Sequence, residues 1–153
     1  MTDFPEQSSA SIEVDAPPEV VWQLIADITR MGEWSPECRR AEWDGDATGP
    51  AVGALFRGWN KAGTYEWEAP CIVTACEPGK LFEFQVPREG SVVTRWRFEF
   101  SPSGAGTILT ESFDAPKINV EGAASNFDGR FEMLDGAIRT TIANVKAAAE
   151  ALR

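Results

Sequence analysis

The C-terminal end of the chain constrains the fold most strongly, because it predicts one long amphipathic helix. From Phe127 to Arg153, apolar residues recur at intervals of three or four, as they do along one face of an α-helix. Between Ser11 and Phe113 the pattern changes to short alternating segments rich in Trp and Phe, separated by turns that contain Gly and Pro. The sequence therefore predicts an α+β fold in which a curved sheet wraps around one C-terminal helix. Such an arrangement often leaves a cavity inside.

Length and charge limit what the chain can be. Its 153 residues favour a single domain, spanning residues 1–153. The net charge of -10, with 14 scattered basic residues, argues against nucleic acid or an anionic membrane surface as partner. No apolar run is long enough to span a membrane, and the polar segment 1–9 does not resemble a signal peptide. A cytoplasmic protein without membrane insertion is expected.

The chain contains no histidine, which removes the commonest general base and the imidazole ligands of metal sites. Cys38, Cys71 and Cys76 have spacings that match no zinc or redox motif. Cys71 and Cys76 lie five residues apart in one predicted strand, so regular alternation would place them on opposite faces. We expect no metal and no cofactor. Catalysis, if any, would depend on carboxylates, Tyr65, Arg, Lys or bound water.

The order of predicted elements begins with a strand at 8–15. Pro17 and Pro18 then favour the start of a helix over about 19–28, followed by a short helix around 30–34. Six more strands are predicted, at 38–44, 54–61, 64–76, 80–87, 92–101 and 106–114. Short turns join most of them, so neighbouring strands should be antiparallel. The polar segment 115–128 reads as a long loop, in which Asn126 or Asp128 could cap the final helix.

Alternation along the strands predicts which side chains face inward. Together with the apolar stripe of the final helix, it gives this set of inward-facing residues: Phe56, Asn60, Trp67, Phe82, Phe84, Thr94, Trp96, Phe98, Phe131, Leu134 and Ile138. The rings could pack into a solid core. They could equally enclose a ligand cavity, because small residues interleave with the large ones and aromatic hollows are typical small-molecule sites.

Glu111 is the exception on this inner surface. In the strand 106–114 it shares a face with Leu109 and Phe113, so it would lie among apolar neighbours if that face points inward. A buried carboxyl group needs a partner or a raised pKa. It could orient the polar end of a ligand or act as an acid or base. Alternatively, it could pair with an Arg or a backbone donor, or the strand could face water.

Several segments resemble the START-related superfamily of polyketide cyclases, dehydrases and lipid-transport proteins, also called SRPBCC. They are residues 15–22 (DAPPEVVW), 27–36, Gly53 with Phe56, 77–79 (EPG) and 106–112. The similarity covers about residues 8–152. It implies the helix-grip fold: a curved seven-stranded antiparallel sheet around a long C-terminal helix, two short helices after the first strand, and a cavity between them. In that layout Trp34 would lie near the cavity mouth, although it could equally pack under the first helix.

The resemblance also implies a class of function. Its members bind lipids, sterols, polyketides or hormones, some cyclise polyketides, and some activate chaperones. We therefore expect binding or transport of a small hydrophobic molecule in an internal cavity, by a monomer or a homodimer. The alternatives are a cyclase or dehydratase that uses Glu111 and Tyr65, and an interaction protein similar to the chaperone activators. The candidate ligand-binding residues are the inward-facing set above with Trp34, Leu109, Glu111 and Phe113.

Overall fold

Seven strands with alternating side chains form one antiparallel sheet, in the order β1-β7-β6-β5-β4-β3-β2. A computed structural model describes residues 7–87, 93–114 and 130–152. The strands are β1 (Gln7–Val14), β2 (Cys38–Asp44), β3 (Leu55–Ala62), β4 (Tyr65–Glu77), β5 (Leu81–Pro87), β6 (Val93–Ser103) and β7 (Gly106–Asp114). Their order along the chain is the predicted one, and their bounds differ from the predicted ones by a few residues at most. Consecutive strands from β2 to β7 are neighbours in the sheet. Strand β1 pairs with β7, so β1 and β2 form the two edges of the sheet.

Three short helical segments follow β1, in the region where two helices were predicted. Helix α1 (Pro18–Ala26) begins at the proline pair, with Glu19 in its first turn, where a carboxylate favours the positive end of the helix dipole. A 3-10 turn, η1 (Ile28–Arg30), is capped by the Asp27 side chain, which accepts a hydrogen bond from the Thr29 N–H at 3.2 Å. It leads into α2 (Met31–Trp34), which ends before Pro36.

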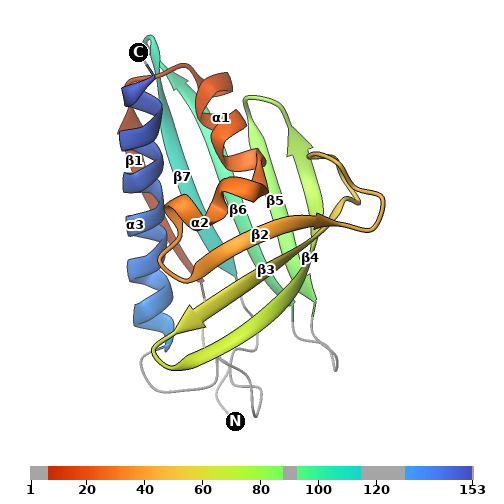
Figure 1. Ribbon diagram of the computed structural model, residues 1–153. Helices are drawn as coiled ribbons and strands as arrows, with labels where there is room; N and C mark the ends of the chain where they lie inside the picture. Colours follow the sequence, from red (N-terminus) through yellow and green to blue (C-terminus); the bar gives the residue numbers. More distant parts are fainter. Residues whose placement is uncertain (1–6, 88–92, 115–129, 153) are drawn as a thin grey trace.

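The predicted C-terminal helix is α3 (Arg130–Ala151), and Figure 1 shows it lying along β1 and β7 with α1 and α2 beside it. Its buried stripe is Leu134, Ile138, Ile142, Val145 and Ala149, at the expected helical spacing. Side-chain hydrogen bonds attach it to the rest of the chain: Asn144 donates to the Trp34 carbonyl at 2.9 Å, and Lys146 donates to the Glu13 carbonyl at 2.7 Å. Asp135 and Glu150 of the helix accept hydrogen bonds from the Ser8 hydroxyl and the Asp15 N–H. The predicted loop 115–128, with the candidate caps Asn126 and Asp128, lies outside the described residues.

A β-bulge in β4 changes one prediction. Val73 pairs with Phe84 and Ala75 pairs with Glu83, so Thr74 is an extra residue on this strand. Beyond the bulge the alternation is shifted by one, because a bulge places two residues opposite one on the partner strand. Cys76 therefore lies opposite the buried Phe82, on the same face as Cys71. The prediction that the two cysteines point to opposite faces was therefore wrong.

Within the described ranges, none of the helices combines the length and the apolar character that crossing a bilayer requires.

Candidate functional site

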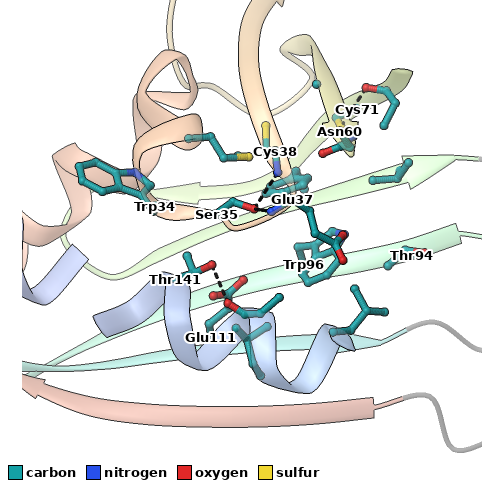
Figure 2. A pocket seen from close by; sticks show the side chains of 18 of the residues that line it. Trp34, Ser35, Glu37, Cys38, Asn60, Cys71, Thr94, Trp96, Glu111 and Thr141 are labelled. Carbon is teal, nitrogen blue, oxygen red and sulfur yellow. Dashed lines mark hydrogen bonds between the residues drawn. The ribbon is translucent and has the colours of Figure 1, made fainter. Parts of the chain in front are cut away.

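A cavity of about 140 Å³ lies between the concave face of the sheet and the helices. Every strand except β1 contributes to its wall, together with α1, α2, α3 and the segment between α2 and β2. Figure 2 shows side chains from these elements pointing into one common space, with Glu111 and Thr141 on one side and Cys38 and Asn60 on the other. The space between the sheet and the helices is therefore not filled by side chains at this point.

Most of the residues predicted to face a cavity do line this one. They are Trp34, Phe56, Asn60, Trp67, Phe84, Thr94, Trp96, Phe98, Glu111, Leu134 and Ile138. Phe82, Leu109, Phe113 and Phe131 do not line it. Phe82 and Leu109 are fully buried at 0% exposure, and Phe113 packs its ring against Trp96 and Phe131 at centroid distances of 5.4 and 5.9 Å. These four side chains belong to the packed core next to the cavity. Tyr65, at 46% exposure, is also outside the lining.

The lining also includes residues that were not among the candidate ligand-binding residues. They are Ile25, Met31, Ser35, Glu37, Cys38, Gly58, Ala69, Cys71, Val86, Ala137 and Thr141. Alternation does place four of these, Gly58, Ala69, Cys71 and Val86, on the inward faces of their strands. Ser35 and Glu37 lie in the turn between α2 and β2, for which a sequence has no periodic signal.

The burial of the lining residues separates the cavity interior from its mouth. Glu111, Phe98, Phe56 and Ile138 are buried. The partly exposed lining residues are Met31, Ser35, Glu37, Asn60, Trp67, Val86, Thr94, Trp96 and Ala137. Six of them, from Glu37 to Trp96 in this list, lie where β3 and β5 end and where β2, β4 and β6 begin, at one end of the sheet. The cavity therefore opens at this end, and its deepest polar group is the Glu111 carboxyl.

Glu111 faces inward from β7, between Ala10 of β1 and Phe98 of β6. Its exposure is 4%, and its Oε1 atom is buried without a hydrogen-bond partner among the described residues. The nearby Thr141 hydroxyl donates instead to the carbonyl of Ala137 at 2.8 Å (Figure 2). Burial raises the pKa of Glu111 well above its usual value, because an apolar surrounding disfavours the charged form. Of the alternatives considered above, exposure to water is wrong, and Oε1 has neither an Arg nor a backbone donor among the described residues.

A second buried carboxyl side chain, that of Glu83, has the hydrogen-bond partners that Glu111 Oε1 lacks among the described residues. Glu83 lies on the opposite face of the sheet, at 6% exposure. It accepts a hydrogen bond from the Thr74 hydroxyl at 2.7 Å and another from Arg97 Nε at 2.8 Å, and it forms an ion pair with that guanidinium. Most buried polar groups in proteins are satisfied in this way. Glu111 is the one that points into a space large enough for a ligand.

The other polar groups of the lining are few. Burial raises the pKa of the Cys38 thiol to about 11 and that of the Cys71 thiol to about 12, so both remain protonated near neutral pH.

The Trp34 Nε1 donor is buried and has no acceptor among the residues described. On the surface side, the Arg30 guanidinium lies over the Trp34 ring at 5.0 Å. No three described side chains come together as a metal-binding group.

Comparisons with known proteins agree with this architecture. Residues 6–150 match the family described as polyketide cyclase / dehydrase and lipid transport. A Polyketide_cyc-like protein from Corynebacterium glutamicum is 32% identical, with a TM-score of 0.65 over 99% of this chain and 96% of that one. A START superfamily protein from Mycobacterium smegmatis has the same fold at 16% identity, with a TM-score of 0.74 over 96% of this chain and 99% of the other.

The fold is also found in the di-domain ARO/CYC of the steffimycin biosynthetic pathway. That protein is 14% identical, with a TM-score of 0.73 over 95% of this chain and 50% of its own. No curated protein matches the sequence significantly. The match over nearly the whole length, and a solved relative that is 32% identical, assign the family. The chain belongs to the START-like family of polyketide cyclases, dehydrases and lipid-transport proteins.

Proposed function

We propose that the chain binds a small, mainly apolar organic molecule in the cavity of about 140 Å³. The observation that carries the proposal is an internal space walled by Phe and Trp rings and open at one end of the sheet. An apolar cavity of about 150 Å³ can hold a molecule of the size of benzene. The ligand, or the part of it that enters, is therefore on the order of one aromatic ring. Burial of its apolar surface would contribute about 25 cal/mol per Å².

The tryptophans provide an internal test. Trp34, Trp67 and Trp96 line the cavity, whereas Trp59 lies on the other face of the sheet, where its Nε1 donates to Glu68 at 3.0 Å. Titration with benzyl alcohol is expected to shift the indole N–H resonances of the three lining tryptophans and to leave that of Trp59 in place. Single Trp→Phe variants assign these resonances in ¹H–¹⁵N spectra. Equal shifts at Trp59, or none for any of the six tryptophans with a series of ring compounds, would contradict the proposal.

A matched pair of variants on α3 extends this test. Ala137 lines the cavity and Ala143 is exposed on the same helix. Ala137→Leu places three additional carbons toward the cavity and is expected to weaken binding by at least tenfold, while Ala143→Leu leaves the affinity unchanged. Leu and Ala have similar helix propensities, so the helix itself is little affected.

An acid–base reaction on the bound molecule is a second candidate function, favoured by one observation. A buried carboxyl group with a raised pKa faces the cavity, as general acids and bases often do. It would transfer a proton to or from a carbon next to a ligand carbonyl. Exchange of the α-hydrogens of phenylacetone in D₂O, followed by NMR, measures this step directly. Wild-type protein is expected to accelerate the exchange and Glu111→Gln to lose the acceleration. The same rate with both proteins would exclude the reaction.

The cavity favours these two functions over an interaction protein of the chaperone-activator type, for which a filled core is expected.

A further inference from the structure

The ionisable side chains that line the cavity are all acids. Two are carboxyl groups, Glu37 near the mouth and Glu111 inside, and two are the thiols of Cys38 and Cys71. No Lys or Arg is among the described residues of the lining, and the sequence contains no His. The whole chain has a net charge of -10. The electrostatic field in and around the cavity therefore disfavours an anionic ligand and favours a cationic one.

The unpartnered oxygen of Glu111 also requires a hydrogen-bond donor. The neighbours across the sheet, Ala10 and Phe98, are apolar, and the Thr141 hydroxyl is already used by the Ala137 carbonyl. A buried acceptor without a partner costs about 1–3 kcal/mol, a cost that disappears when a ligand supplies the donor. The donor must come from the cavity side, because α3 and the neighbouring strands cover the other directions.

We propose that the cavity selects a small aromatic amine, whose ammonium group donates to Glu111 while its ring packs against the aromatic wall, and that it rejects carboxylates of the same size. This inference rests on the proposed ligand-binding function and identifies the chemical class of the ligand. The Trp96 and Phe98 rings beside Glu111 suit it, because aromatic faces attract a cation. An ammonium–carboxylate contact is in addition a charge-assisted hydrogen bond.

Binding of such an amine is linked to one proton. Burial raises the pKa of Glu111, so in the free protein this carboxyl group keeps its proton to a higher pH than an exposed carboxyl group does. When an ammonium ion binds, the carboxyl group releases its proton to the solvent and the resulting carboxylate pairs with the cation. The other titratable groups that face the cavity are Glu37, before β2, Cys38 on β2 and Cys71 on β4. The described parts of β1, β6, α1, α2 and α3 place none there.

Three ligands of nearly equal size separate the effects: benzylamine, benzyl alcohol and benzoate. We expect calorimetry at pH 7 to show that benzylamine binds at least tenfold more tightly than benzyl alcohol, and that benzoate does not bind measurably. Titrations in two buffers of different ionisation enthalpy should show that protons are released when benzylamine binds and that none are released when benzyl alcohol binds. A pH series should show that the benzylamine affinity rises with pH below the pKa of Glu111.

Two variants locate the selectivity. Glu111→Gln keeps the size and shape of the side chain, and it is expected to abolish both the amine preference and the proton release. Glu99→Gln removes an exposed carboxyl group of β6 that lies on the other face of the sheet, opposite Thr110, and is expected to retain both. Benzyl alcohol binding to Glu111→Gln, seen through the indole resonances of the lining tryptophans, shows that the cavity is still formed.

The outcomes of these experiments separate the selectivity for amines from ligand binding itself. Equal binding of benzylamine and benzyl alcohol, without proton release, overturns the amine inference and leaves the ligand-binding function standing. Tight binding of benzoate overturns it as well. Failure of all three compounds to bind wild-type protein counts against the ligand-binding function itself.

Discussion

Replacing Glu111 by Gln is expected to stabilise the folded protein near neutral pH and to have little effect near pH 4. The reason is the raised pKa of this carboxyl group, which is caused by burial. Above the unfolded-state value of about 4.5, the unfolded chain loses the proton and the folded protein keeps it. The folded state then binds more protons, so this group lowers the free energy of unfolding by about 1.4 kcal/mol per pH unit. The decrease continues up to the folded-state pKa and then stops.

Denaturant unfolding of wild-type protein and Glu111→Gln at half-unit intervals from pH 4 to pH 8 measures this effect. The difference in free energy of unfolding should grow with pH in favour of the variant, because all other titrating groups are common to both proteins. Glu83→Gln is the matched control, since it removes the negative charge that pairs with Arg97 and should destabilise the protein. A difference between wild-type protein and Glu111→Gln that is constant with pH would show that Glu111 is not held protonated.

Phe82→Ala is expected to lower the free energy of unfolding by about 3–5 kcal/mol. The Phe82 ring is fully buried and lies 6.2 Å from the Phe84 ring between centroids, opposite Phe98 on β6. Its loss leaves a hole that the sheet cannot close. Because Phe82 does not line the cavity, the affinity of the folded variant for benzyl alcohol should stay near that of the wild type.

Urea denaturation and calorimetric titration together check both parts of this expectation. Leu55→Ala, at a position with 46% exposure, is the control and should change the free energy of unfolding by no more than about 0.5 kcal/mol. A large loss of ligand affinity at full stability in Phe82→Ala would mean that this ring contacts the ligand.

The strands, their order and their inward faces could be predicted from the sequence, because period-two alternation survives wherever a strand is regular. In β3, for example, Phe56 and Asn60 line the cavity as expected. The prediction failed at the bulge in β4, where one extra residue moved Cys76 inward. Alternation has no signal for such an insertion, since it depends on the pairing with β5.

Alternation also could not separate a cavity wall from a packed core. Trp96 and Phe113 both face inward and their rings lie 5.4 Å apart between centroids, yet only Trp96 lines the cavity. Which of the two rings lines the cavity depends on the curvature of the sheet and on the position of α3. For Glu111, the sequence indicated a carboxyl group among apolar neighbours but left open a partner from elsewhere in the chain. Only the three-dimensional arrangement shows that Oε1 has no partner among the described residues.

The pairing of β1 with β7 has a consequence for how the molecule assembles during synthesis. Ser8 pairs with Phe113 and Val14 pairs with Thr107, so the first strand of the sheet, β1, pairs with the last, β7. A nascent chain can complete the hairpins from β2 to β7 on its own, but β1 stays without its neighbour until β7 has left the ribosome. Contacts between such distant segments slow folding.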